Sequence, residues 1–375
     1  MTKTTPNIQR LIDELCPEGV ELEDLGKIAE IGTGSSNGNE ATENGRYPLF
    51  VRSKTVKAID TYEFDEEAIV IPGEGGVGEI FHYINGKYAL HQRAYRIHFS
   101  TSKILTKFAY YYLFANFLPY ILKKSVNATV KSLRKPMIEK FAIPIPPLPI
   151  QEAIVDILDT FTTLEAELEA ELEARRKQYE YYRDSLLVSG DKNSTIFRLG
   201  TLAKNLDSKR KPVTRSARKS GDIPYYGASG IVDYVSDFIF DGNYLLVSED
   251  GANLLARNTP IAFSVTGKSW INNHAHILEF ENGITQRFVE IYLNSIDLSL
   301  YISGAAQPKL NQANLNRIEI PLPAFAEQER IVGILDKFDA LVNDISIGLP
   351  AEIKARRQQY EFYRDKLLTF KELQK

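Results

Sequence analysis

The stretch QEAIVDILDTFTTLEAELEAELEARRKQYEYYRDSLL, from Gln151 to Leu187, occurs again as QERIVGILDKFDALVNDISIGLPAEIKARRQQYEFYRDKLL, from Gln328 to Leu368. Matching residues are 177 positions apart at the front of the repeat and 181 apart at the back, so the second copy carries four additional residues around 348–350. An internal repeat of this length indicates a duplicated architecture.

The apolar residues of both copies recur at steps of three and four, which is the heptad pattern of a coiled coil with charged flanks. In the first copy they include Ile154, Leu158, Phe161, Leu168, Leu172 and Tyr179. Each copy should form a long helix, and the first would span roughly 55 Å at 1.5 Å per residue. Because both helices belong to one chain, we expect them to pack against each other as an antiparallel pair. The inserted residues and Pro350 should kink or interrupt the second helix.

A segment with β-strand patterns precedes each helix. Short runs rich in β-branched and aromatic residues, such as Ala68–Pro72 and Ala94–Phe99, alternate with glycine-rich turns. Leu105–Lys124 has a helical, aromatic pattern, and a proline-rich collar enters each long helix. The fold class is therefore α+β: two β-rich globular domains joined and separated by two long helices that form an antiparallel coiled coil, with an internal pseudo-two-fold repeat. The expected domains are residues 1–142 and 191–320, with helical regions at 143–190 and 321–375.

Composition indicates an ordinary water-soluble chain of 375 residues, with 43% apolar and 25% charged residues and a formal net charge of −4. The single cysteine, Cys16, excludes an internal disulfide, and no apolar run reaches the length of a membrane span. We expect a cytoplasmic protein.

Charge is strongly segregated along the chain. Residues 198–220 hold eight lysines and arginines against one acidic residue, and residues 120–140 hold six against one. Two basic clusters at comparable places in the two repeats favour binding of a polyanion, whereas either cluster alone could be a solvated loop.

Catalytic and cofactor motifs are not evident in the sequence. Gly73–Gly78 fits G-x-G-x-x-G, but no helical pattern follows it, so a glycine turn is the better interpretation. Gly267-Lys268-Ser269 lacks the first glycine of a phosphate-binding loop, and His274 and His276 lack metal-ligand spacing, which favours structural or hydrogen-bonding roles. We expect no catalytic residues and no metal in this chain.

Several segments resemble one known family. They are the opening Leu11–Glu21, the stretch YYGASGIVDYV at Tyr225–Val235, the stretch GAAQPKLNQANLNRIEIPLP at Gly304–Pro323, and the two collars followed by Gln-Glu-x-Ile-Val. All are similar to the specificity (S) subunit of type I restriction–modification systems, and the resemblance covers essentially the whole chain.

The resemblance implies a non-catalytic subunit that recognises double-stranded DNA. In that family each target-recognition domain reads one half of a bipartite, gapped sequence, and the coiled coil sets the spacing. Two methyltransferase (M) subunits, which carry S-adenosylmethionine, dock on the assembly, and restriction/translocase (R) subunits can join. This chain itself would bind no cofactor. The alternative is a coiled-coil scaffold with two protein-binding domains, which does not explain the duplicated basic clusters.

Lysines and arginines grip phosphates, whereas arginine, asparagine and glutamine read base edges. The predicted DNA-binding residues of the first domain are Gly34, Ser35, Ser36, Asn37, Arg52, Lys54, Arg93 and Lys131. Those of the second domain are Lys209, Arg210, Lys211, Arg215, Asn253, Arg257, Lys268, Asn272 and Lys309.

Overall fold

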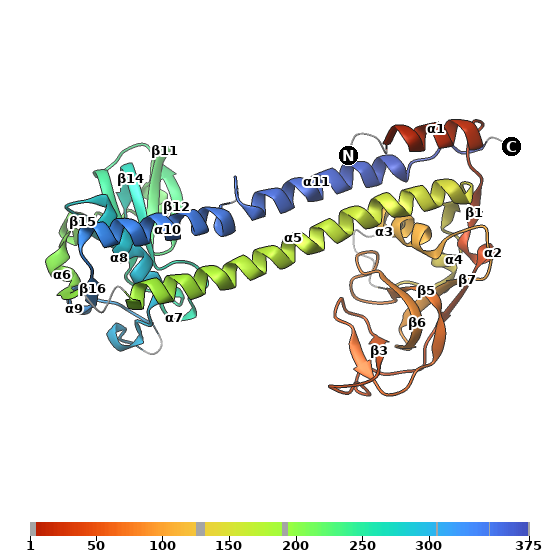
Figure 1. Ribbon diagram of the computed structural model, residues 1–375, viewed down its shortest axis with the longest axis horizontal. Helices are drawn as coiled ribbons and strands as arrows, with labels where there is room; N and C mark the ends of the chain where they lie inside the picture. The colour runs from red at the N-terminus through yellow and green to blue at the C-terminus, as the bar shows by residue number, and fades with distance from the viewer. Residues whose placement is uncertain (1–4, 125–131, 190–193, 305–306, 345, 374–375) are drawn as a thin grey trace. The chain divides into compact units, whose positions relative to one another are not determined.

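The structure is a computed structural model that describes residues 5–124, 132–189, 194–304, 307–344 and 346–373 (Figure 1). The chain forms two compact units. Unit 1 comprises Met1–Glu169 with Ile353–Lys375, and unit 2 comprises Ala170–Glu352. Each unit therefore contains one β-rich domain together with part of each helical region.

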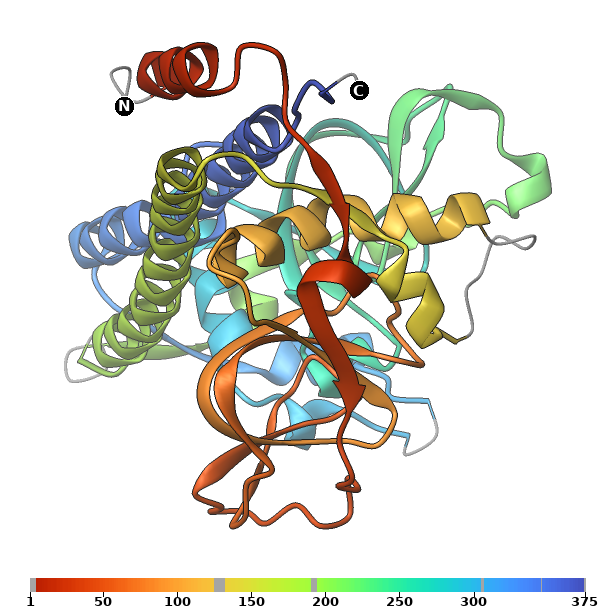
Figure 2. The same cartoon turned by 90° about the vertical axis from the view of Figure 1, so that its right-hand side faces the viewer.

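Unit 1 is built on a six-stranded sheet of order β2-β7-β5-β6-β3-β4, and its strands curve strongly (Figure 2, orange). Neighbouring strands are antiparallel except β3 and β6, which are parallel. The strands are β2 (Ala29–Thr33), β3 (Tyr47–Phe50), β4 (Lys57–Ile59), β5 (Phe64–Pro72), β6 (His82–Leu90) and β7 (Ala94–Phe99).

Unit 2 repeats this sheet in the order β10-β15-β13-β14-β11-β12, again with a single parallel pair, β11 and β14. Its strands are β10 (Ala203–Asn205), β11 (Ser220–Gly227), β12 (Gly230–Val235), β13 (Phe240–Ser248), β14 (Ala262–Ile271) and β15 (Ala275–Phe280). The two strand orders match one for one. The internal repeat expected from the sequence is therefore present in the fold.

The elements around the sheets also correspond between the units. A two-stranded sheet accompanies each large one, β1 (Leu22–Asp24) with β8 (Ala142–Pro144) in unit 1 and β9 (Thr195–Arg198) with β16 (Glu319–Leu322) in unit 2. The matching helices are α2 (Leu25–Ile28) and α6 (Leu199–Leu202), α3 (Thr106–Lys124) and α8 (Gly283–Ser295), and α4 (Lys135–Glu139) and α9 (Gln312–Arg317). The fold class predicted from the sequence is confirmed.

The core of each unit lies where the sheet meets its helices. In unit 1, Phe108, Leu113 and Phe117 of α3 are fully buried in the same cluster as Ile69 and Ile97 of the sheet. In unit 2, Phe288 and Leu293 of α8 are buried in the same way. Removing this aromatic and aliphatic surface from water is the main stabilising contribution to each unit.

The first turn of each long helix contains an equivalent buried glutamine, Gln151 or Gln328. In α5 (Leu148–Ser189), Gln151 Nε2 donates to Pro146 O at 2.7 Å, while Gln151 Oε1 accepts from Leu105 N at 2.8 Å. In α10 (Phe325–Asn343), Gln328 Nε2 donates to Pro323 O at 2.8 Å. Each amide thus fastens its proline collar to the first turns of its helix.

Within unit 1, α5 packs antiparallel to α11 (Leu349–Leu367). The Phe161 ring stacks on Tyr363 at 5.7 Å, and Glu165 and Glu169, farther along α5, pair with Arg357, which is earlier in α11. The heptad pattern predicted this pairing.

Within unit 2, the later part of α5 packs against α10. The rings of Tyr182 and Phe338 lie 5.6 Å apart, and Leu187 and Ile331 are buried in one cluster. The second helical region is interrupted between Asn343 and Leu349, and Pro350 lies in the first turn of α11, where its missing N–H costs nothing. The interruption expected at Pro350 is therefore present.

Both chain ends belong to unit 1. The first helix, α1 (Thr5–Leu15), buries Ile8 in the core of that unit. Val20 N donates to Lys371 O at 2.8 Å, and Leu373 N donates to Val20 O at 3.0 Å. Within the described ranges, every helix is too short or too polar to cross a lipid bilayer.

Candidate nucleic-acid interface

The two units present the same backbone frame at one end of their sheets. Gly73 N donates to Arg93 O at 2.8 Å in unit 1, and Glu249 N donates to His274 O at 2.9 Å in unit 2. Leu133 N and Leu310 N then donate to the carbonyls of Gly73 and Glu249 at 2.7 and 2.8 Å. The turns β6–β7 and β14–β15 therefore sit on equivalent supports, and the residue after each support is acidic: Glu74 or Asp250.

In unit 1 the Glu74 carboxylate binds two of the arginines predicted to contact DNA. Glu74 Oε2 accepts from Arg52 Nη1 at 3.2 Å and from Arg93 Nη1 at 3.1 Å. Arg52 and Arg93 remain 44% and 57% exposed, and each uses only one of its N–H donors on Glu74. Arg52 and Glu74 line a hollow of about 440 Å³, together with Lys57 and buried His91.

His91 is fixed in one tautomer. Its Nδ1 accepts the backbone N–H of Arg93 at 2.9 Å, so in the neutral ring Nε2 carries the proton. Burial, and then the charges of Arg52 and Arg93, lower the pKa of His91, which favours this neutral form. Among the described residues Nε2 has no acceptor, so its N–H is available at the hollow.

The matching turn of unit 2 carries other side chains. Asn272 Oδ1 accepts the backbone N–H of His274 at 2.8 Å, in the same way as His91 accepts that of Arg93. His274 Nδ1 lies 2.9 Å from Asp250 Oδ2. This contact corresponds to the hydrogen bond from Arg93 to Glu74 in unit 1. Lys309, which is half exposed, pairs with Glu249 at 3.1 Å beside this turn.

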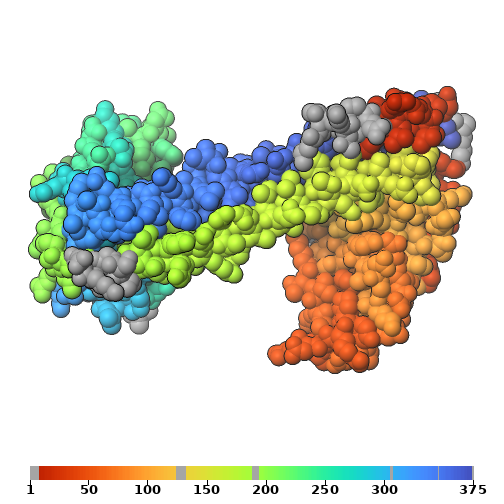
Figure 3. Space-filling view, in the orientation of Figure 1, coloured from red at the N-terminus to blue at the C-terminus, as the bar shows by residue number. Residues whose placement is uncertain are grey.

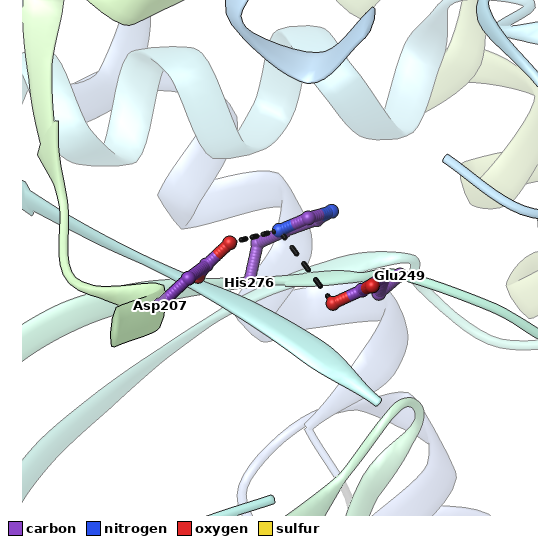
Figure 4. A group of neighbouring side chains, drawn as sticks. All are labelled: Asp207, Glu249 and His276. Carbon is purple, nitrogen blue, oxygen red and sulfur yellow. Dashed lines mark hydrogen bonds and ion pairs between the residues drawn. The ribbon is translucent and has the colours of Figure 1, made fainter. Parts of the chain in front are cut away.

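Beneath this turn, unit 2 contains a buried charged network (Figure 4). His276 Nδ1 lies 2.6 Å from Asp207 Oδ2, and His276 Nε2 lies 2.7 Å from Leu310 O. Arg210 reaches Glu249 at 2.6 Å and Ala275 O at 2.8 Å. In unit 1 the contact equivalent to that of His276 with Leu310 O is made by an uncharged side chain: Tyr95 OH donates to Leu133 O at 3.4 Å.

Asp207, Glu249 and His276 could be taken for a metal site, since one ligand atom of each lies within 4.8 Å of the others. The donor geometry argues against that interpretation. Both ring nitrogens of His276 already have oxygen partners, Asp207 Oδ2 at 2.6 Å and Leu310 O at 2.7 Å, which leaves neither nitrogen free to bind a metal. Arg210 and Lys309 further balance Glu249.

The carboxyl groups of this network are stabilised as anions. Burial acts to raise the pKa of Asp207, but the hydrogen bond and charge of His276 outweigh it, and the pKa lies below its ordinary value. For Glu249, burial is likewise outweighed by hydrogen bonds from Arg210 and Lys309, which lower its pKa. The network therefore joins β15 and the segments that follow β10 and β13 to the segment around Leu310.

The basic segment after β10 is fastened by its backbone. Trp270 Nε1 donates to Lys211 O at 2.7 Å, and Val213 N donates to Tyr225 OH at 3.1 Å. The side chains of Lys209, Lys211 and Arg215 stay exposed. This arrangement presents the three predicted cations on a fixed segment.

Other predicted residues of unit 1 lie in or near the same turns. The loop Gly34–Asn37 is tied down by acids: Glu63 accepts from Ser35 N at 2.8 Å and from Ser36, and Glu40 accepts from Asn37 N at 3.1 Å. Ser36, one of the predicted DNA-binding residues, is buried. Lys54 is exposed, and Lys131 lies outside the described residues.

For three predicted residues of unit 2 the structure differs from the expectation of available donors. The Arg210 guanidinium is bound inside the charged network, and the Asn253 amide closes a loop onto both Thr259 N and Thr259 O. Arg257 Nη2 donates to Ile296 O at 2.8 Å at the end of α8. These side chains hold the fold. Lys268 remains exposed, with its Nζ 4.7 Å from the Phe238 ring centroid.

Sequence reasoning missed Glu74, His91, Asp250 and His274 as members of the site. Only the offset of 181 between Gly86–Phe99 and Gly267–Phe280 could have aligned His91 with Asn272 and Arg93 with His274. It also missed the acidic partners of His276, because Asp207 lies 69 residues away in the sequence.

A sheet that occurs twice in one chain, with one strand order and different charged turns, defines a protein with two duplicated domains. The chain belongs to the family described as the type I restriction modification DNA specificity domain, whose model matches residues 17–174 and again residues 191–355.

Relatives and solved structures agree with this membership. A putative type I restriction enzyme specificity subunit of Haemophilus influenzae is 39% identical over 47% of this chain, and the match spans about half (46%) of that protein. The EcoR124I/EcoR124II specificity subunit of Escherichia coli is 32% identical over 72% of each chain. The crystal structure of a type I restriction-modification S subunit from M. genitalium has the same fold, with a TM-score of 0.64, 16% identity, and coverage of 93% of this chain and 96% of that one.

Proposed function

We propose that this chain is the subunit that recognises double-stranded DNA in a type I restriction–modification assembly. Each sheet domain would read one half of an asymmetric, gapped target. The observation that carries the proposal is the pair of equivalent turns, β6–β7 and β14–β15, which have the same backbone support but different donor groups. Different donors on one frame favour two different half-sites.

The long helices would set the distance between the half-sites. Helix α5 supplies residues to both units, Leu148–Glu169 to unit 1 and Ala170–Ser189 to unit 2. Because an α-helix rises a fixed 1.5 Å per residue, its length constrains the span between the domains that it enters. The target gap would follow from that constraint.

The helices would also dock two methyltransferase subunits, one per repeat. Residues 174–187 and 355–368 have nearly the same sequence. Packing between the helices accounts for this similarity only at the positions that face the neighbouring helix. The outward Tyr181 and Phe362 are equivalent and 70% and 64% exposed. Figure 3 shows side chains of α5 along the surface of the molecule. Equal exposed aromatic anchors at two places suit two copies of one protein partner.

Catalysis and cofactor binding would belong to those partners. S-adenosylmethionine would be held by the methyltransferase subunits, and this chain would supply positioning on DNA. In support, the His276 group, which has the spacing of a metal site, uses both of its ring nitrogens internally. Restriction/translocase subunits would complete an assembly that also cleaves.

Reconstitution with the methyltransferase subunit and S-adenosylmethionine tests the proposal. The complex is incubated with a DNA library containing random sequence, and methylated adenines are mapped by single-molecule sequencing. One gapped, asymmetric motif is the expected result. Methylation without any motif, or an assembly that does not bind DNA in a salt titration, would favour the alternative of a protein scaffold.

A further inference from the structure

We propose that the turns His91–Arg93 and Asn272–His274 are the two base-reading elements, and that the exchange of Arg93 for His274 makes the half-sites differ. This inference rests on the proposed function and deepens it. It assigns the side chains that determine specificity and the base edges that they would accept.

The first support is that the two turns are built alike. In each, a buried side chain accepts the backbone N–H two residues later: His91 Nδ1 from Arg93 at 2.9 Å, and Asn272 Oδ1 from His274 at 2.8 Å. Both accepting residues are more than nine-tenths buried. The third residue of each turn is therefore held in a fixed position with its side chain pointing outward.

The second support is that an equivalent carboxylate orients each outward side chain. Glu74 binds Arg93 at 3.1 Å, and Asp250 binds His274 at 2.9 Å. An arginine or histidine oriented in this way loses little conformational entropy when it meets a ligand. Glu74 and Asp250 are thus positioning residues.

In unit 1 the hollow and the turn beside it present several donors around the Glu74 carboxylate. Arg52, which lines the hollow, and Arg93, which shares Glu74 with it, each give one N–H to Glu74 and keep the others. His91 also lines the hollow. In the major groove, guanine presents two acceptors, O6 and N7, side by side, which suit a guanidinium. The first half-site should therefore contain a guanine that Arg93 reads.

In unit 2 the outward group is chemically different. Because His274 Nδ1 is bound to Asp250, its proton lies on Nδ1 in the neutral ring, and Nε2 then presents a lone pair. A lone pair accepts from the exocyclic amine of adenine or cytosine and not from guanine O6 or N7. In its neutral form His274 therefore suits adenine or cytosine at the corresponding step of the second half-site.

The test exchanges the two side chains in the full methyltransferase assembly. Arg93→His and His274→Arg are each assayed on the random library, with the exposed Arg46→His of unit 1 as the matched control. Arg93→His should reduce the preference for guanine at one position of the first half-site by about 10- to 100-fold, leaving the second half-site and the gap unchanged. His274→Arg should introduce a guanine preference in the second half-site.

Arg93→Lys separates base reading from phosphate contact and guards against a folding defect. A lysine keeps the charge but lacks the forked donors, so overall affinity should persist while the guanine preference falls. Weaker binding to all sequences with unchanged preference would place Arg93 on a phosphate and overturn the inference. A wild-type assembly without any gapped motif would overturn the proposed function itself, a result distinct from the first.

Discussion

Replacing Asp207 with asparagine should destabilise unit 2 by about 3–5 kcal/mol, the usual result of breaking a buried ion pair by removing one partner. The Asp207 side chain is 7% exposed, and that of His276 is 1% exposed. The two carboxylate oxygens of Asp207 accept from His276 Nδ1 at 2.6 Å and from Ile277 N at 3.0 Å. An amide has one oxygen, so it can satisfy one donor and must turn its own NH₂ toward the other.

Thermal unfolding followed by calorimetry measures the effect. For a unit of this size each kcal/mol corresponds to roughly 2–4 °C, so the transition of unit 2 should fall by roughly 6–20 °C. Asp222→Asn, at an exposed position of β11, is the control and should change stability by less than about 0.5 kcal/mol. A shift of Asp207→Asn no larger than that of the control would refute the assignment of a buried ion pair.

The same network predicts the response to acid. The pKa values of Asp207 and Glu249 lie below their ordinary values in the folded chain. Their stabilising contribution is therefore complete above the ordinary range near pH 4 and is lost as the pH falls through the folded values. Unit 2 of the wild-type chain should lose stability in that acidic window, and Asp207→Asn should flatten the curve. An equally steep acid transition in the variant would contradict the linkage.

Three further outcomes are expected. Combining Lys209→Ala with Lys211→Ala should weaken binding to all DNA sequences. The slope of the logarithm of the binding constant against the logarithm of the salt concentration should fall in magnitude by up to about 2. An unaltered slope would show that these lysines do not contact the DNA. Deleting Ile347–Pro350 should shorten the gap between the two half-sites of the methylated motif, or abolish methylation of gapped sites. An unchanged gap would refute the proposal that the helices set this distance. Tyr181→Ala and Phe362→Ala should each weaken binding of one methyltransferase subunit by about 1 kcal/mol or more, seen as a lost stoichiometric equivalent in native mass spectrometry. If the variant that combines Tyr181→Ala and Phe362→Ala still binds both methyltransferase subunits, these two residues do not belong to the docking face.

Much of the fold could be predicted because its signals are local or periodic. The strand Ala94–Phe99 and the helix near Leu105–Lys124 carry their own residue patterns, and the structure has β7 at Ala94–Phe99 and α3 at Thr106–Lys124. The turn at Gly73–Gly78 is also present, with Gly75, Gly76 and Gly78 at positive φ. The strand order was not predictable, because the parallel pairing of β3 with β6 depends on contacts between distant segments.

The candidate site was harder to predict because charge alone does not say where a side chain finds its partner. Arg210 and Lys211 are neighbours in the same basic run, yet Arg210 is bound to Glu249 while Lys211 is exposed. The acid that binds Arg210 lies 39 residues away in the sequence. His91 and His274 gave no local signal, because their roles depend on the alignment of two turns in the duplicated sheets.

The pairing of both chain ends in unit 1 has a consequence for synthesis on the ribosome. Leu367 and Leu368 are buried in the core of unit 1, and Leu373 N bonds to Val20 O. Unit 2 is continuous from Ala170 to Glu352, so it can fold before the chain is finished. Residues 1–169 of unit 1 are made before unit 2, but their core closes only after Leu367 and Leu368 have left the exit tunnel. The nascent first domain should therefore depend most on chaperones until the segment that contains Leu367 and Leu368 has emerged.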